Sequence, residues 1–225
     1  MGHSSWVASH SAVRHLRRLV RGQTMKANRL IDLLALYGVN AVLLVAFYFQ
    51  LAHGELPCSL CNLQRVAFML LGAGLLMNVR SRNPSPANYA LSAVGALVGS
   101  LIGLMQMFLH VLPGTPPYGG AILGMHMYTA SYVVLTASII YCVLMLAFQT
   151  RLQAIHVGVA RSGEAGRSPF VKLAASLFAA LVIGNLVSVF VETGFHALYS
   201  DPQHYHLLYC GDPEAPAHPG SMSCR

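Results

Sequence analysis

The sequence GELPCSLCNLQRVAFMLLGAGLL, residues 54–76, places two cysteines and an arginine at the start of a long apolar run. A helix that crosses a bilayer needs about 20 mostly apolar residues. The run after Cys58 and Cys61 approaches that length, so both thiols are expected where a membrane helix meets water.

The composition of the whole chain is that of a membrane protein. Its 225 residues are 55% hydrophobic and only 9% charged, whereas soluble domains carry about 25% charged residues. Backbone groups have no water partner in lipid, so each spanning segment is predicted to be an α-helix. We predict an all-α membrane protein with five spans, at about residues 30–50, 61–78, 87–112, 123–148 and 171–197.

Basic residues cluster on one side of this predicted topology. Twelve of the fourteen lie in segment 1–29 or in and beside the connections after the second and fourth spans. Because basic loops stay in the cytoplasm, we expect a cytoplasmic segment at 1–29, an uncleaved first span and an external tail at 198–225. The one-sided pattern also argues that the net charge of +7 does not serve nucleic-acid binding.

Four of the five cysteines fall on the outer side, namely Cys58, Cys61, Cys210 and Cys224. An even number of cysteines in an oxidising compartment indicates disulfides. The simplest pairing is Cys58 with Cys61 and Cys210 with Cys224. The second pair either takes part in thiol–disulfide exchange or only cross-links the tail. Cys142 lies within the fourth span, where a lone cysteine is expected to pack as a small apolar residue.

Cys58, Cys61 and Arg65 share one helix face if the helix begins near Pro57, because their spacing is i, i+3, i+7. A cation and the positive end of the helix dipole favour the thiolate, which is the reactive form. Arg65 either stabilises such a charge or anchors the helix at the lipid surface. Oxidation of a thiol pair releases two electrons, and an acceptor at the bilayer edge suggests a lipid-soluble quinone.

The chain carries two motifs of a known family: PCSLCNLQR at 57–65 and YGGAILGMHMYTASYVV at 118–134. They resemble the DsbB family of bacterial inner-membrane thiol:quinone oxidoreductases, and the similarity covers about residues 30–150. The resemblance implies a four-helix bundle, here followed by a fifth helix. It also implies that ubiquinone or menaquinone regenerates a Cys58–Cys61 disulfide, that Arg65 contacts the quinone, and that a periplasmic DsbA-like thioredoxin-fold protein is the dithiol partner.

The chain departs from this family in the position of its second cysteine pair. Known members carry that pair between the third and fourth helices, but the corresponding loop here, PGTPPYGGAILG at 113–124, has no cysteine. We therefore hypothesise that Cys210 and Cys224 in the tail are the catalytic shuttle pair. Exchange needs only thiolate attack on an accessible sulfur. The Pro and Gly content of the tail favours a flexible segment that can reach Cys58 or Cys61.

Polar residues near the outer helix ends are candidates for quinone binding. Gln64 adjoins Arg65, Gln106 and His110 lie near the end of the third span, and His126 lies at the outer end of the fourth. A histidine can orient a quinone oxygen or relay a proton. His126 can equally be a hydrogen-bonded structural residue.

Small and polar residues within the spans predict how the helices pack. Gly95, Gly99 and Gly103 recur at every fourth position of the third span, a spacing that lets helix backbones approach closely. Asn40 and Asn185 are expected to face the bundle interior and to form hydrogen bonds between helices.

Two other functions remain open from the sequence. A reductase of the vitamin K epoxide reductase type also has a helical bundle with Cys-x-x-Cys at a helix mouth, and the direction of electron flow would separate it. A non-catalytic metal-binding protein would use tail residues such as His204, His206 and Cys210. Zinc needs four ligands, and no second compact pair completes that set, so we predict no metal site.

Overall fold

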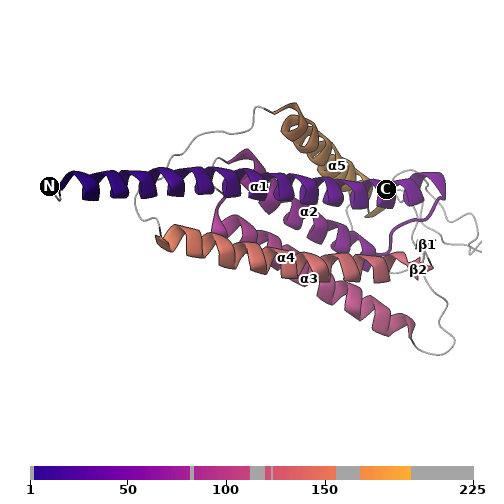
Figure 1. Ribbon diagram of the computed structural model, residues 1–225. Helices are drawn as coiled ribbons and strands as arrows, with labels where there is room; N and C mark the ends of the chain where they lie inside the picture. The colour runs from indigo at the N-terminus through magenta and orange to yellow at the C-terminus, as the bar shows by residue number, and fades with distance from the viewer. Residues whose placement is uncertain (1–2, 82–83, 112–119, 123, 156–167, 194–225) are drawn as a thin grey trace, which may run out of the picture.

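The computed structural model describes residues 3–81, 84–111, 120–122, 124–155 and 168–193 (Figure 1). Within them the helices are α1 (His3–Ala52), α2 (Ser59–Arg80), α3 (Pro86–His110), α4 (Met127–Ile155) and α5 (Pro169–Thr193), and the strands are β1 (Ala121–Ile122) and β2 (Met125–His126). Among the described residues, five helices are long and apolar enough to cross a membrane. The predicted all-α membrane fold, a four-helix bundle with a fifth helix, is therefore confirmed.

Some helix ends differ from the predicted spans. The apolar window of α1 begins at Lys26, but the helix begins at His3 and extends past the other helices (Figure 1). α4 begins at Met127 rather than at residue 123, because β1 and β2 pair in an antiparallel hairpin whose Gly124 has a φ of 78°. Residues 112 and 194–197 of the predicted third and fifth spans lie outside the described residues.

Helices α1 to α5 all contribute side chains to one hydrophobic core. α2 packs against α1 and α3, and α3 packs against α4. Leu43 of α1, Phe68 and Leu71 of α2 and Leu135 of α4 are buried in this core. Cys142 is a free cysteine in the same core and is fully buried, as expected for a packing residue.

α3 approaches its neighbours through its glycines. A Cβ on Gly95 would lie 2.8 Å from the Leu70 Cβ of α2, and a Cβ on Gly103 would lie 3.1 Å from the Tyr132 Cβ of α4. Gly99 lies between α2 and α4, where a Cβ would meet side chains of both helices. The predicted use of small residues for close packing is confirmed.

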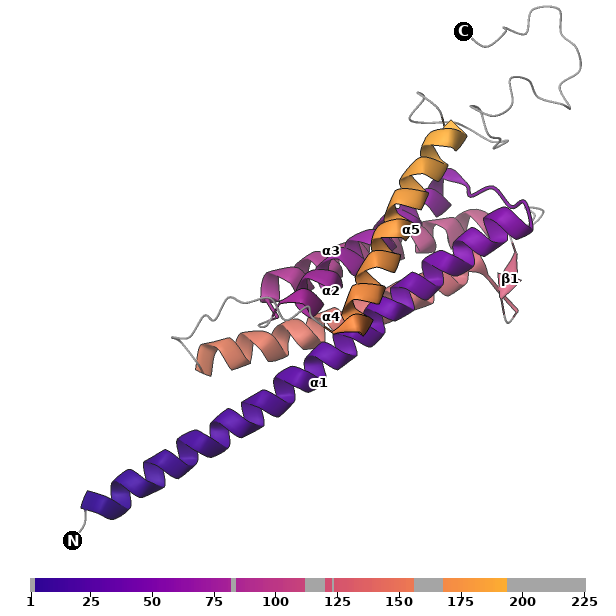
Figure 2. The ribbon, with the colours of Figure 1, turned by 90° about the horizontal axis from the view of Figure 1, so that it is seen from above.

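α5 crosses α1 and α2 at an angle and contacts both helices (Figure 2). Asn40 of α1 donates its Nδ2–H to the carbonyl oxygen of Ala174 in α5 at 3.1 Å, which confirms the predicted bond between helices. The same prediction for Asn185 is wrong. Its Nδ2–H is donated to the Leu181 carbonyl oxygen at 2.9 Å, one turn back in the same helix.

Polar side chains are buried at both ends of the bundle. We call these the disulfide end, around Cys58 and Cys61, and the Asp32 end, where α1 enters the bundle. At the Asp32 end, the fully buried Asp32 carboxylate accepts hydrogen bonds from the hydroxyls of Tyr89, at 2.7 Å, and Tyr141. These two bonds tie α1 to α3 and α4 across the bundle.

Candidate active site

The site is built on the first turn of α2, where Cys58 and Cys61 form a disulfide. Cys58 is the N-cap residue, and its Sγ accepts a hydrogen bond from the Cys61 backbone N–H at 3.1 Å. The helix thus begins one residue after Cys58, and the two Cα atoms lie 5.0 Å apart. This is the short-range pairing that the sequence predicted.

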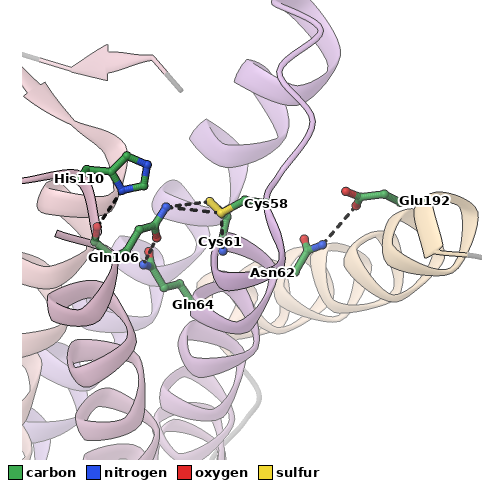
Figure 3. Close-up of a disulfide and its surroundings, with 7 residues drawn as sticks. All are labelled: Cys58, Cys61, Asn62, Gln64, Gln106, His110 and Glu192. Carbon is green, nitrogen blue, oxygen red and sulfur yellow. Dashed lines mark hydrogen bonds between the residues drawn. A yellow bond between two sulfur atoms is a disulfide. The ribbon is translucent and has the colours of Figure 1, made fainter. Parts of the chain in front are cut away.

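Gln64 and Gln106 form a short chain of hydrogen bonds that ends at the two sulfur atoms (Figure 3). Gln106 of α3 directs its Nε2–H toward the Sγ of both Cys58 and Cys61, at 3.4 Å from each. The Oε1 of Gln106 accepts a hydrogen bond from Gln64 Nε2 at 2.8 Å. Both glutamines are buried, and the bond to Gln64 fixes which end of the Gln106 amide faces the sulfurs.

The Arg65 side chain points into the bundle rather than toward lipid headgroups. Its side chain is 8% exposed. Nη1 donates to Gln50 Oε1 at 2.7 Å, and Nη2 donates to the Ala46 carbonyl oxygen at 3.2 Å. The guanidinium carbon lies 5.6 Å from the centre of the Phe47 ring, close enough for a cation–π contact. The alternative of a surface anchor does not fit this placement.

A cavity of about 640 Å³ opens beside the disulfide and is bounded by α1, the segment before α2, and parts of α2, α3 and α4. Apolar residues such as Val42, Phe68 and Val134 form much of its wall. The polar or reactive side chains that line it include those of Cys61, Gln64, Arg65 and Gln106. Three predicted quinone-site residues and one cysteine of the disulfide therefore share one cavity.

The two predicted histidines lie near this cavity but are not among its lining residues. His110 and His126 each stack on the ring of Tyr128, at centroid distances of 5.2 and 5.4 Å. Tyr128 itself lines the cavity. His110 Nδ1 also lies 2.8 Å from the Gln106 carbonyl oxygen, so this histidine supports the end of α3.

The segment between α1 and α2 contacts the start of the β-hairpin at the disulfide end. Glu55 lines the cavity and accepts a hydrogen bond from the Gly120 backbone N–H at 2.8 Å. Gly54 has a φ of 68°, a conformation that favours glycine and turns the chain after α1. Sequence reasoning did not single out Glu55, because only the docked β-hairpin brings its partner to it.

Some predicted residues cannot be placed in this geometry. Cys210 and Cys224, with the tail histidines, lie outside the described residues. In the described part of the chain, no three His, Cys, Asp or Glu side chains gather closely enough to hold a metal ion.

A disulfide at a helix N-terminus beside an apolar cavity fits the class of membrane thiol–disulfide oxidoreductases. Residues 28–119 match the family model described as disulfide bond formation protein DsbB. Over these residues the chain is similar to the DsbB family, and its five long apolar helices are those of a multi-pass membrane protein. Neither the curated proteins nor the solved structures gave a match. The matched segment contains α1, α2 and α3 but not α4 or α5.

Proposed function

We propose that the chain is a thiol:quinone oxidoreductase. It would reoxidise a DsbA-like periplasmic dithiol protein and pass the electrons to ubiquinone or menaquinone in the membrane. The single observation that carries this proposal is that Cys61 and Arg65 line the same cavity. A reducible sulfur pair and a permanent cation thus lie where an apolar electron acceptor can bind.

The cavity fits a quinone by size and lining. Its volume of about 640 Å³ is within the range of roughly 300–1,000 Å³ typical of small-molecule pockets. The apolar wall suits a ring and the start of an isoprenoid chain. Arg65 and Gln64 would hold the quinone by donating hydrogen bonds to its carbonyl oxygens, and Arg65 is always protonated.

The chain's own residues account for the thiol half of the reaction. A thiolate of the partner attacks one sulfur of Cys58–Cys61, which breaks that bond and forms a mixed disulfide. The second partner thiol resolves it and leaves both cysteines reduced. The Gln106 Nε2–H, which already faces both sulfurs, then stabilises a thiolate.

Reoxidation of the pair requires a two-electron acceptor. A bound quinone supplies that acceptor and leaves as hydroquinone after taking up two electrons and two protons. Loss of the same two electrons and two protons restores the Cys58–Cys61 disulfide. Arg65 favours this direction because it places positive charge where a carbonyl oxygen gains electron density.

Steady-state turnover under anaerobic conditions tests the proposal. The purified chain in vesicles receives a reduced thioredoxin-fold dithiol protein and a short-chain benzoquinone, and hydroquinone is followed by absorbance. The proposal predicts one hydroquinone for each partner disulfide formed. If partner oxidation does not reduce quinone, or if electrons run from hydroquinone to the partner disulfide, the proposed direction is wrong.

The tail cysteines are proposed as a shuttle between the partner and Cys58–Cys61. The proposal comes from their number and their expected side of the membrane. A partner lacking its resolving cysteine would trap the first mixed disulfide for mapping by mass spectrometry. Attachment to Cys210 or Cys224 would support the shuttle, and attachment to Cys58 or Cys61 alone would indicate direct exchange.

The proposed location is the bacterial inner membrane, with the N-terminus in the cytoplasm and the tail in the periplasm. The one-sided distribution of basic residues supports this orientation. A reporter enzyme that is active only in the periplasm, fused after Arg225, should be active. Activity of the same reporter fused before α1 but not after Arg225 would reverse the orientation.

A further inference from the structure

One stripe of α5 faces the part of the bundle that holds Arg65. Gly184, Ser188 and Glu192 are spaced four residues apart and therefore lie on one face of the helix. Ser188 bonds to Gln50 of α1, and Glu192 bonds to Asn62 of α2. These contacts come from a helix that lies beyond the DsbB match at 28–119.

The first link from α5 to Arg65 runs through the Gln50 amide. Ser188 Oγ accepts a hydrogen bond from Gln50 Nε2 at 2.7 Å. The other end of the same amide, Oε1, accepts from Arg65 Nη1 at 2.7 Å. The serine hydroxyl therefore selects the orientation in which the amide oxygen faces the guanidinium. Gln50 is 3% exposed and its bond to Arg65 is buried, so the amide has little competition from water.

The second link runs through the Phe47 ring. The Arg65 guanidinium lies over this ring, and the ring in turn lies against Gly184. A Cβ on Gly184 would be 3.2 Å from Phe47 Cζ, a separation that would force the ring to shift. The absence of a side chain at this position thus leaves the ring where it supports Arg65.

We infer that α5 positions Arg65 for quinone binding, with Ser188 as a positioning residue that acts through Gln50. The inference rests on the proposed quinone reaction and adds that the fifth helix sets the strength of quinone binding. Ser188 does not line the cavity, so its effect must pass through Gln50 and Arg65. α5 would then tune the acceptor site, while the thiol chemistry of α2 and α3 runs without it.

The test compares Ser188→Ala, which removes the acceptor, with Ser188→Thr, which keeps the hydroxyl. Ser176→Ala is the matched control, because Ser176 is an exposed serine of α5 that bonds only locally, to the Leu173 carbonyl oxygen. Quinone affinity is read without turnover, from the dependence of the melting temperature on the concentration of a decyl-substituted benzoquinone. Steady-state kinetics then separate KM for quinone from kcat and from KM for the dithiol partner.

Ser188→Ala should weaken quinone affinity and raise KM for quinone by about three- to tenfold, the effect of one hydrogen bond. Its kcat and its KM for the dithiol partner should stay within about twofold of the parent chain. Ser188→Thr should restore most of the affinity, and Ser176→Ala should match the parent chain. Gly184→Leu is a second, independent variant that should weaken quinone affinity by displacing Phe47.

Two results overturn the inference, and they are distinguishable. If the parent chain shows no stabilisation by quinone, the proposed function fails and the inference fails with it. If Arg65→Leu loses quinone affinity while Ser188→Ala and Gly184→Leu both retain it, the proposed function stands and the role of α5 is wrong.

Discussion

The disulfide end and the Asp32 end of the bundle both bury polar side chains, but they use them differently. At the Asp32 end, the carboxylate is fully buried and its two oxygens accept hydrogen bonds from Tyr89 and Tyr141. At the disulfide end, Gln64, Arg65 and Gln106 line a cavity beside the redox pair. One end is occupied with its own partners, and the other presents donors to a space that a ligand can enter.

From this difference we expect the Asp32 end to stabilise the bundle and the disulfide end to carry the chemistry. Buried polarity is costly unless it is paired, and paired groups fix how helices dock. The Asp32 end meets that requirement between three helices. At the disulfide end, Arg65 bonds to Gln50 and to the Ala46 carbonyl oxygen, and its side chain also lines the cavity. Matched substitutions at the two ends can therefore test the comparison.

The largest effect is expected at the cysteines. Cys61→Ser removes one sulfur of the disulfide, so oxidation of a dithiol partner should fall to background. Cys142→Ala changes a buried cysteine of the core that is not part of the disulfide, and it should retain most of the activity. The measurement is the rate of partner thiol loss, and substantial turnover by Cys61→Ser would break the assignment of the redox pair.

The next largest effect is expected at Arg65, and Arg29 near the other end is the matched control. Arg65→Leu should raise KM for quinone by about 10- to 100-fold, because hydrogen bonds from charged groups are worth about 1.5–3 kcal/mol. Arg29→Leu removes an arginine that bonds to the Val79 carbonyl oxygen near the Asp32 end, and its KM for quinone should be unchanged. Equal effects of the two variants, measured by steady-state kinetics, would argue against a quinone site at Arg65.

Replacing one buried glutamine at each end should give a smaller difference in kcat/KM between the two variants. Gln106→Leu should lower kcat/KM for the dithiol partner by about three- to tenfold, since it removes one neutral donor from the sulfurs. Gln149→Leu changes a buried glutamine of α4 that is outside the cavity lining. It should leave kcat/KM unaltered. If Gln106→Leu also has no effect, the donor contact with the sulfurs is irrelevant to exchange.

The smallest effect on activity is expected at Asp32. Asp32→Leu leaves two buried tyrosine hydroxyls without their acceptor, at about 1–3 kcal/mol each, which should lower the melting temperature by roughly 5–15 °C. Tyr141→Phe removes one of the two bonds and should cost less. Well below the melting temperature, KM for quinone should equal that of the parent chain. A large rise in that KM would mean that the two ends are coupled.

The sequence predicted those parts of the site that depend on local spacing. Cys58, Cys61 and Arg65 lie within two turns of one helix, so a helix start at the membrane edge sufficed to bring them together. Gln106 followed from the expectation that the ends of neighbouring helices meet at the same depth. The disulfide and the lining of the cavity agree with both predictions.

Other features depend on how helices dock, which spacing does not specify. In the sequence, Gln50 is simply the polar residue that ends the first predicted span. Nothing nearby in the sequence links it to Ser188 of α5. Asn185 could bond to a neighbouring helix or to its own previous turn, and only the crossing of α5 decides between them. The hairpin before α4 was hidden because its apolar residues continue the hydrophobic run.

The most direct test of the account is a single reduction of quinone by the Cys58–Cys61 pair. A chain with Cys210→Ser and Cys224→Ser is reduced, freed of reductant and mixed anaerobically with a short-chain benzoquinone. We predict one hydroquinone formed per chain and the loss of two thiols, mapped by mass spectrometry to Cys58 and Cys61. Quinone that stays oxidised, with both thiols still reduced, would contradict the central claim.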